Sequence, residues 1–516
     1  MRILHHSCRD HCILKLCILC SICILLYSCP NQYPSTTGLH YVSLEGDDEN
    51  PGTLQKPWGS FQKACENVSP GDTVYIRGGT YTERLIIRSS GTAEEPILFA
   101  AYPGETPIID GETIEIPDAW GGLIQASEKN HIRIRGFTIK NAKGFAIFAV
   151  DGEDIIIENN LTDNSWGSGI LAWGDRDLII RGNEVSEAST LGYQEAISIS
   201  HSNEFELYDN DVHNCHLEGI DVKGGSRNGT IHGNTVHDFN LLGIYVDAWD
   251  GDEFNINVFD NLVYACAEGI RVNTENGGIA RDIRVYGNTV RDCTGNGFWV
   301  GVGGVKDVAH TVRDVEFFKN SSYNNRIGMT ISVPINSHTE NIKVFNNLIY
   351  KNSYNGIMVD DNSSRTATEF STIRIINNTV WGNGFENSFV DPTEWAHGGI
   401  FITAPNVQDV LVRNNIVSGN KNFNIAVHTE VPAGVVTIDH NLIYSETISS
   451  IEAAGTDTVQ GNPLFLNEAG GDFRLSPNSP AIDMGASLNE DTPSTDYAGN
   501  PRPKGAGVDI GAYECY

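Results

Sequence analysis

Short runs of alternating hydrophobic and polar residues recur along most of the chain, and each run ends at an asparagine. These runs are rich in Ile and Val, are separated by Gly and Asn turns, and lack the spacing of a helix. Between about residues 130 and 445 the asparagines recur every 23 to 37 residues, at Asn160, Asn183, Asn210, Asn234, Asn261, Asn288, Asn320, Asn347, Asn378, Asn415 and Asn441. A repeat of this length predicts an all-β solenoid with three strands in each coil. We expect the asparagine amides to bond the backbone of neighbouring coils as a structural ladder.

A second pattern follows each asparagine by about ten residues. Alternation along a strand should send its aliphatic pair inward and the other pair to solvent. The outward side chains of successive coils are therefore expected to form one exposed surface. The segments are Glu195–Ser200, Glu218–Lys223, Leu242–Asp247, Glu268–Asn273, Asn296–Gly301 and Asn355–Asp360.

The ends of the repeat region resemble those of many secreted β-helix proteins. That resemblance implies a right-handed, single-stranded parallel β-helix with capped ends. Residues 38–125 are interpreted as an N-terminal cap with the first coils, and a short amphipathic helix is expected at about Ser60 to Asn67. Residues 126–445 are assigned to the parallel β-helix with a central active face, and residues 446–516 to a closing segment.

The N-terminal segment, residues 1–28, has the features of an export signal. Basic residues lie near an apolar run, Ile13–Tyr27, which is too short and too close to the terminus to favour a spanning helix. The sequence Leu26-Tyr27-Ser28-Cys29 resembles the lipobox of bacterial lipoproteins, which implies lipidation at Cys29. We therefore predict a protein at the cell surface or in the periplasm, attached to the membrane only through a lipid.

Composition narrows the range of partners. The chain has 66 acidic and 34 basic residues, for a net charge of −32. Nucleic acid and anionic membrane surfaces are negatively charged, as this chain is, so neither is an expected partner. The charge also serves to keep an exported protein soluble. Cysteines outside the leader are too scattered to predict a disulfide framework, and Cys215, Cys266 and Cys293 are interpreted as buried thiols.

The candidate catalytic and binding residues lie at the outward positions of three successive coils. Registering the strands places Lys223 beside Asp247, and Asp221 beside Tyr245, which in turn neighbours Arg271. Harmless pairing of surface charges is one interpretation of this cluster. The aromatic residues around it favour a sugar site instead. The predicted substrate-binding residues are Glu195, Glu218, Asp221, Asn273, Trp249 and Trp299.

One chemistry that fits is β-elimination on a uronate. In this reaction Lys223 serves as base, Arg271 binds the carboxylate, and Tyr245 protonates the leaving oxygen. Nearby carboxylates raise the pKa of a lysine, which opposes its use as a base. Calcium held by Asp221, Asp247 and Asp250 would offset that effect.

The other chemistry is glycoside hydrolysis, in which two carboxyl groups flank the scissile bond. Asp247 and Glu268, on adjacent coils, are the predicted pair. A non-catalytic carbohydrate-binding solenoid is the third hypothesis. Trp120, Trp166 and Trp173 on earlier coils are interpreted as core aromatics, with sugar stacking as the alternative.

From about residue 38 to 445 the chain resembles the pectate-lyase-like β-helix superfamily. The stretches Glu218–Lys223, Gly243–Trp249 and Glu268–Ile270 are similar to the β-xylosidases of glycoside hydrolase family 120. That resemblance implies Asp247 as nucleophile, Glu268 as acid/base, and Glu218 and Lys223 as sugar ligands. The lysine-centred coil is also similar to family 9 pectate lyases, in which a lysine acts beside a calcium held by aspartates.

The predicted function is β-elimination on an acidic oligo- or polysaccharide, because Lys223 and Arg271 concentrate positive charge on an acidic molecule. The enzyme would be a polysaccharide lyase or a C4-hydroxyl dehydratase, and its product an unsaturated uronate. The resemblances suggest degradation of uronate-bearing polysaccharides such as ulvan. Hydrolysis and simple binding stay open.

Overall fold

A computed structural model of the chain describes residues 38–117, 120–302, 308–332, 337–360, 369–385, 397–445, 452–453, 455–487 and 492–515. The predicted export signal and the lipidation site Cys29 lie outside the described residues. No helix in these ranges is long and apolar enough to cross a membrane.

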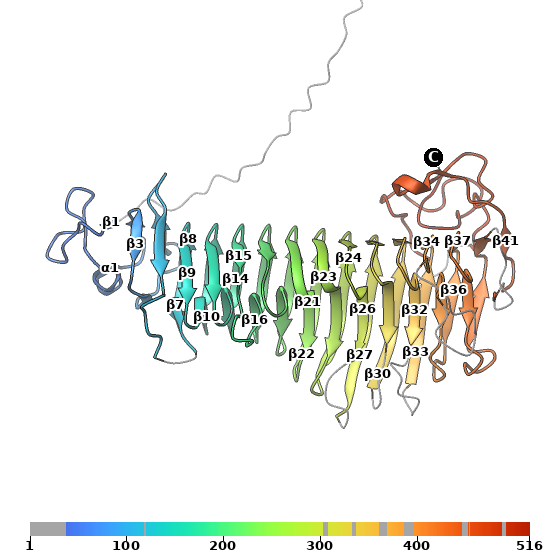
Figure 1. Cartoon of the computed structure of the whole chain (residues 1–516), viewed down its shortest axis with the longest axis horizontal. Coiled ribbons are helices and arrows are strands. Elements are labelled where there is room, and N and C mark those ends of the chain that lie inside the picture. Colours follow the sequence, from blue (N-terminus) through green and yellow to red (C-terminus); the bar gives the residue numbers. More distant parts are fainter. Residues whose placement is uncertain are drawn as a thin grey trace, which may run out of the picture. The chain divides into compact units, whose positions relative to one another are not determined.

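The described chain from Gly38 onward forms a mostly-β parallel solenoid of about 13 turns (Figure 1). A 15-stranded parallel sheet forms the first series of strands, which comprises β1 (Gly38–Val42), β2 (Asp72–Ile76), β5 (Ile97–Ala101), β8 (Asn130–Arg135), β11 (Glu153–Glu158), β14 (Arg176–Arg181), β17 (Asn203–Tyr208), β20 (Arg227–His232), β22 (Asp252–Phe259), β24 (Ile279–Tyr286), β27 (His310–Phe318), β30 (Ser337–Phe345), β33 (Glu369–Ile376), β36 (Val410–Arg413) and β39 (Val436–Asp439).

A 26-stranded sheet contains two further series, which share β21 and β23. The second series comprises β3 (Gly79–Tyr81), β6 (Pro107–Asp110), β9 (Thr138–Ala142), β12 (Leu161–Ser165), β15 (Glu184–Ser186), β18 (Asp211–His213), β21 (Thr235–Ala248), β23 (Leu262–Thr274), β25 (Thr289–Arg291), β28 (Ser321–Tyr323), β31 (Leu348–Tyr350), β34 (Thr379–Trp381), β37 (Ile416–Ser418), β40 (Leu442–Tyr444) and β41 (Val459–Gln460). The third series adds β4 (Leu85–Ile87), β7 (Gly122–Ser127), β10 (Phe145–Val150), β13 (Ile170–Trp173), β16 (Ile197–Ser200), β19 (Ile220–Lys223), β26 (Asn296–Val302), β29 (Ile327–Ser332), β32 (Ile357–Asp360), β35 (Ile400–Ile402) and β38 (Ile425–Val427).

Identical inward positions stack from coil to coil and form the core. Ile197, Ile220 and Ile244 are aligned on consecutive strands and are buried. Removing such aliphatic side chains from water contributes about 1.5–3 kcal/mol each. The inward half of the predicted alternation is therefore confirmed.

The predicted asparagine ladder is confirmed as well. Asn183 Nδ2 donates to Asn210 Oδ1 of the next coil at 3.0 Å and to the Ile157 carbonyl at 3.0 Å. Each amide thus satisfies backbone groups that a tight turn would otherwise leave unpaired. A second ladder, which the sequence analysis did not identify, runs through Asn325, Asn352, Asn383 and Asn420. The thiols of Cys215, Cys266 and Cys293 are buried as predicted.

Two strands at mid-solenoid are unusually long. β21 and β23 continue where neighbouring coils divide into two short strands, and their pairing shifts register between Phe239 and Leu242. The strands β19, β21 and β23 carry several of the predicted site residues, namely Asp221, Lys223, Tyr245, Asp247, Glu268, Arg271 and Asn273.

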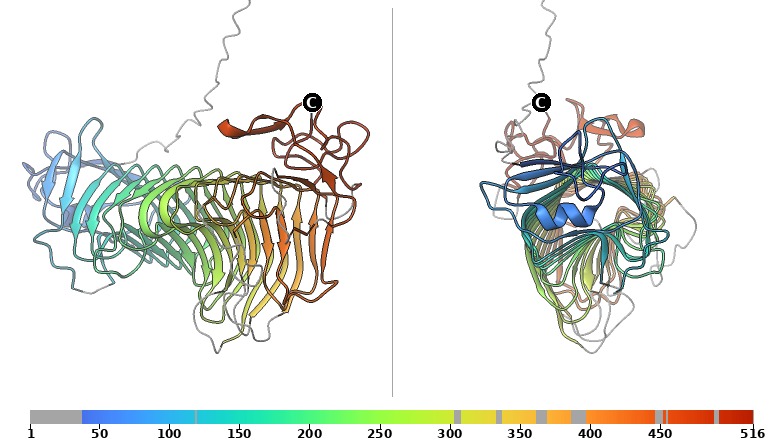
Figure 2. Two further views of the ribbon diagram at one scale, coloured as in Figure 1. Left: turned by 45° about the vertical axis from the view of Figure 1, so that its right-hand side comes forward. Right: turned by 90° about the vertical axis from the view of Figure 1, so that its left-hand side faces the viewer.

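The predicted N-terminal helix is present as α1, Phe61–Asn67. Ser60 caps it by accepting a hydrogen bond from the Lys63 amide, and Phe61, Ala64 and Cys65 are buried. Figure 2 shows α1 near the first coils, where it contacts β1 and β4. Shielding of the open solenoid end by α1 stays a proposal.

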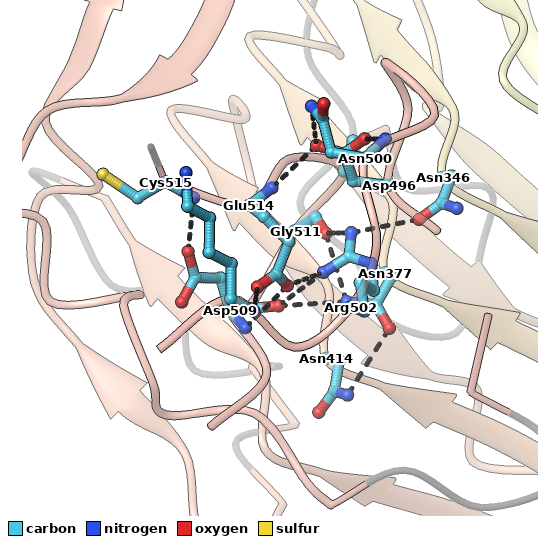
Figure 3. Close-up of polar contacts among 12 residues, drawn as sticks. Asn346, Asn377, Asn414, Asp496, Asn500, Arg502, Asp509, Gly511, Glu514 and Cys515 are labelled. Carbon is cyan, nitrogen blue, oxygen red and sulfur yellow. Dashed lines mark hydrogen bonds and ion pairs between the residues drawn. The ribbon is translucent and has the colours of Figure 1, made fainter. Parts of the chain in front are cut away.

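The C-terminal segment packs on the outer turns of later coils through buried polar contacts. It contains the strands β42 (Phe465–Asn467) and β43 (Asp472–Leu475) and the 3₁₀ turn Glu468–Gly470. Buried Arg502 forms an ion pair with Glu514 at 2.6 Å and bonds Asn346 Oδ1 at 3.1 Å (Figure 3). Asn377 donates to the carbonyls of Asp509 and Gly511. These contacts anchor the segment to the solenoid.

Candidate active site

A cavity of about 600 Å³ lies on the third series of strands at mid-solenoid. It contains many of the predicted site residues. Its lining is Trp173, Gln194, Glu195, Ser200, His201, Glu218, Asp221, Lys223, Gly224, Tyr245, Asp247, Trp249, Asp250 and Glu275.

The strand register matches the prediction. Lys223 pairs with Asp247 across β19 and β21, and Asp221 pairs with Tyr245. Tyr245 in turn pairs with Arg271 on β23. Parallel, in-register pairing thus gathers residues that are about 25 positions apart in the sequence.

The expected exposure of this surface is wrong. The exposed fractions of Asp221, Tyr245 and Asp247 are 2%, 4% and 4%. Residues outside the strands, including Trp249 and Asp250, line the same cavity and enclose these positions. The outward face is therefore a recessed polar cavity, in which electrostatic interactions are stronger than on an open sheet.

Lys223 is the centre of the charge cluster. Its Nζ lies 2.6 Å from both carboxylate oxygens of Glu195 and 3.0 Å from Asp221 Oδ2. Burial lowers the pKa of Lys223, but the coulombic effects of Asp221 and Glu195 outweigh burial and leave it raised. The side chain is therefore an ammonium in the resting protein, with Glu195 as its nearer counter-ion.

Two carboxyl groups beside Lys223 have pKa values raised above their usual range. Burial, and then the charge of Glu275, raises the pKa of Asp247 to about 8. Burial raises the pKa of Asp221 well above its usual range, although Lys223 opposes this effect. Oδ1 of each has no hydrogen-bond partner among the described residues. Buried acceptors without donors are costly, and such groups concentrate at functional sites.

Tyr245 is engaged by its neighbours. Its hydroxyl donates to Glu275 Oε1 and accepts from Asn273 Nδ2 at 2.8 Å. Burial raises the pKa of Tyr245 well above its ordinary value, so the hydroxyl keeps its proton. The proton that the sequence analysis assigned to the leaving group is directed at Glu275 in this structure.

Four predicted residues are not part of the cavity lining: Glu268, Arg271, Asn273 and Trp299. The Arg271 guanidinium lies 3.8 Å from the ring centroid of Trp299, in a cation–π contact, and 3.6 Å from Glu268 Oε2. Burial raises the pKa of Glu268 despite Arg271. The hydrolytic pair of Asp247 and Glu268 is therefore not brought together in this cavity, and the roles of these four residues stay predictions.

The predicted calcium ligands do not form a metal centre by themselves. The described ranges contain no group of three or more His, Cys, Asp or Glu side chains placed to hold a metal ion. The Lys223 ammonium lies against Asp221, where a cation would have to bind. The present residues therefore do not fit a calcium ion in this arrangement, and no chemical step is assigned to one.

Sequence reasoning missed several residues of the cavity. Trp173 stacks on His201 at 4.5 Å, and Ser200 Oγ lies 2.8 Å from His201 Nδ1. Ser200 lies in the predicted outward segment Glu195–Ser200, and Trp173 is its register partner on β13, so both share the strand position of Lys223, although neither was predicted as a site residue. Glu275 follows the end of β23, where alternation no longer predicts direction.

The interpretation of the earlier tryptophans as core residues is also wrong. Trp120 and Trp166 are 47% and 40% exposed, and Trp173 is partly exposed at the cavity wall. Trp173 shares an outward strand position with Val150 and Ser200, and Trp120 and Trp166 lie outside the strands, so strand alternation directs none of these indoles into the core.

Known proteins resemble this chain in sequence and fold. The family model "Pel9A-like, right handed beta helix region" matches residues 40–366. The uncharacterized protein YwoF of Bacillus subtilis strain 168 is 25% identical over 480 residues, which are 86% of this chain and 91% of YwoF. Pectate lyase PEL9 of Emericella nidulans is 31% identical over 146 residues, which are 26% of this chain and 35% of the lyase. A structure of XylC with xylose covers 92% of this chain and 99% of XylC, at 12% identity and a TM-score of 0.47.

Proposed function

Because this chain belongs to the family of Pel9A-like right-handed β-helix proteins, we propose that it is a carbohydrate-active enzyme that performs β-elimination on a uronate residue. The observation that carries the proposal is the partly buried Lys223 ammonium, which lies 2.6 Å from Glu195 in a cavity that also contains Asp247. The name of the related fungal pectate lyase supports the same class of reaction.

The reaction needs a base for the proton next to the uronate carboxyl group. The raised pKa of Lys223 opposes its use as this base, so we assign the ammonium proton to Glu195, 2.6 Å from Nζ, as the group that takes it when a bound substrate displaces water from the cavity and leaves a neutral amine. The Lys223 amine then removes the C5 proton, and the C5–H electron pair forms the C4–C5 double bond. The C4–O bond breaks as this double bond forms, and its electron pair leaves with the oxygen.

The leaving oxygen needs a proton, and Asp247 is the group that can supply it. Its pKa of about 8 keeps it protonated at neutral pH, and it lies on the strand next to Lys223. We assign the acid role to Asp247 rather than to Tyr245, because the Tyr245 hydroxyl is already bonded to Glu275.

Raised pKa values of several carboxyl groups reduce the negative charge that an anionic substrate meets in this acidic cavity. Burial raises the pKa of Glu218, Asp221 and Asp247. A carboxylic acid that keeps its proton donates a hydrogen bond to a developing oxyanion instead of repelling it. We assign this stabilising role to Asp221.

Glycoside hydrolysis is the second candidate, and the raised pKa of Asp247 favours it. Asp247 would protonate the glycosidic oxygen, and Glu195 or Glu218 in the same cavity would be the second carboxyl group. Lys223 would then be a sugar ligand.

Product analysis separates the two reactions. The protein is incubated with uronate oligosaccharides and, separately, with aryl xylosides. Elimination predicts ultraviolet absorbance of an unsaturated uronate, which Lys223→Ala abolishes. Aryl release that survives Lys223→Ala but is lost in Asp247→Asn would replace elimination by hydrolysis. Retention of the oligosaccharide without either product would make the solenoid a binding protein.

We also propose that the protein is exported and lipid-anchored at Cys29. The support is the sequence of the leader alone. Cys29→Ala should move the protein from the membrane fraction to the soluble fraction of the cell envelope. Unchanged membrane association would contradict the anchor.

A further inference from the structure

A second cavity adjoins the active site on its N-terminal side. It has a volume of about 400 Å³ and is lined by Trp120, Gln125, Ser127, Phe148, Val150 and Trp173. Trp173 lines both cavities. The lining of the second cavity contains no ionisable side chain, whereas the active-site cavity contains seven Asp, Glu or Lys residues.

The two cavities lie along one line of outward strand positions. Register pairs Ser127 with Val150, Val150 with Trp173, Trp173 with Ser200, and Ser200 with Lys223. Adjacent strands are about 4.8 Å apart, so Ser127 lies roughly 19 Å from Lys223 along the solenoid. An extended ligand that reaches from one cavity to the other therefore passes Trp173.

The polar groups of the second cavity are arranged for hydroxyl groups. Gln125 Oε1 accepts from Arg84 Nη2 at 2.7 Å, which directs Nε2 to Ser127 Oγ at 2.8 Å. Ser127 keeps its own proton for donation. Arg84 also donates from Nε to the Gly122 carbonyl, so its guanidinium fixes the positions of Gly122 and Gln125.

The apolar groups are arranged for the C–H face of a ring. Trp120 contacts Trp173 edge to face, with centroids 5.3 Å apart, and Phe148 forms part of the same wall. Aromatic walls with a few fixed polar groups are typical of small-ligand sites. A carboxylate here would lose its water without gaining a cationic partner, which is unfavourable.

We propose that this cavity is a subsite for a neutral sugar residue of the oligosaccharide whose uronate occupies the active-site cavity. This inference rests on the proposed function for the position of the uronate. It makes the substrate a heteropolysaccharide that combines uronate with neutral sugars, rather than a uronate homopolymer.

Binding measurements test the subsite independently of catalysis. The probes are an oligosaccharide that alternates galacturonate with rhamnose and an oligogalacturonate of equal length. Isothermal titration calorimetry is done in a Lys223→Ala background, so that product formation does not disturb the titration. We expect the alternating probe to bind about fivefold more tightly, and Trp120→Ala to remove this preference, because one aromatic stacking contact contributes about 1 kcal/mol.

Trp166→Ala is the matched control. Trp166 is similarly exposed, precedes β13 by a few residues, and lines neither cavity. It should leave the preference unchanged. Equal affinity for the two probes, a preference that survives Trp120→Ala, or no binding of either probe would overturn the subsite.

Failure of the proposed reaction would look different. Suppose that the wild-type protein forms no unsaturated uronate, yet the alternating probe still shows a preference that depends on Trp120. Elimination is then wrong, and the neutral subsite stands.

Discussion

Two clusters of buried charge in this chain are built in opposite ways. In the C-terminal cluster around Arg502, both carboxylate oxygens of Asp496, Asp509 and Glu514 accept hydrogen bonds (Figure 3). In the active-site cavity, Oδ1 of Asp221 and of Asp247 has no donor among the described residues. The carboxylates of the first cluster all have donors, although Arg502 Nε has no partner among the described residues, whereas the second cluster leaves carboxyl oxygens available to a ligand.

The pKa values express the same difference. Burial raises the pKa of Asp509 to about 6, and the hydrogen bonds from the amides of Asp483 and Cys515 oppose this rise. Burial raises the pKa of Asp247 to about 8, with Glu275 adding to the effect. A fully bonded acid is suited to holding a segment in place, and an under-bonded acid to transferring a proton.

The largest expected effect comes from removing the cation of the active-site cavity. Lys223→Ala should lower kcat for unsaturated-uronate formation by about 10³-fold or more, because the base is lost. Initial rates from ultraviolet absorbance measure it. Because Lys223→Ala leaves buried Glu195 and Asp221 without their cation, some loss of stability is expected, and circular dichroism at the assay temperature checks that the variant is folded while its rate is measured.

The opposite pattern is expected at the other cluster. Arg502→Leu leaves Glu514 buried without its partner and should destabilise the fold by about 3–5 kcal/mol. Chemical denaturation measures this loss. The kcat of the folded fraction should not change. A fall in kcat as large as that of Lys223→Ala would remove the distinction between the two clusters.

The pH dependence of turnover should identify Asp247 as the acid. Above its pKa of about 8, Asp247 is ionised and kcat should fall by about tenfold for each pH unit. The pH profile of kcat measures this limb, and a conservative Asp247→Glu variant should shift it. A kcat that keeps rising above pH 8 would contradict this role.

The smallest effect is a gain in stability at the active site. The pKa of Asp221 in the folded protein is raised above the unfolded value of about 3.9. Its contribution to the free energy of unfolding is therefore stabilising below pH 4 and is lost as pH rises towards the folded pKa. Asp221→Asn should therefore increase unfolding free energy by about 1 kcal/mol at pH 7, and by less at pH 5.

The matched change in the other cluster is Asp509→Asn. It should lower stability at pH 7, because it weakens acceptors that two backbone amides use. If both substitutions shift stability in the same direction, the contrast in bonding does not explain the difference in role.

Local sequence patterns were sufficient for the coil register but not for the shape of the site. The Ile and Val alternation and the asparagine spacing predicted that Lys223 would lie beside Asp247, because in-register parallel pairing follows from the repeat. Burial of Asp221 and the place of Glu275 depend on residues beyond the strand ends, where no periodicity applies. Arg271 lies against Trp299, its register partner on β26, and its role at the substrate stays a prediction.

The central claim is that the under-bonded cavity around Lys223 is where the sugar reacts. A crystal structure of the Lys223→Ala variant with an alternating uronate oligosaccharide tests it most directly. We expect a uronate ring in the cavity, with its C4 oxygen within hydrogen-bond distance of Asp247 and its C5 facing the space vacated by Lys223. An oligosaccharide bound on another face of the solenoid, with this cavity empty, would contradict the account.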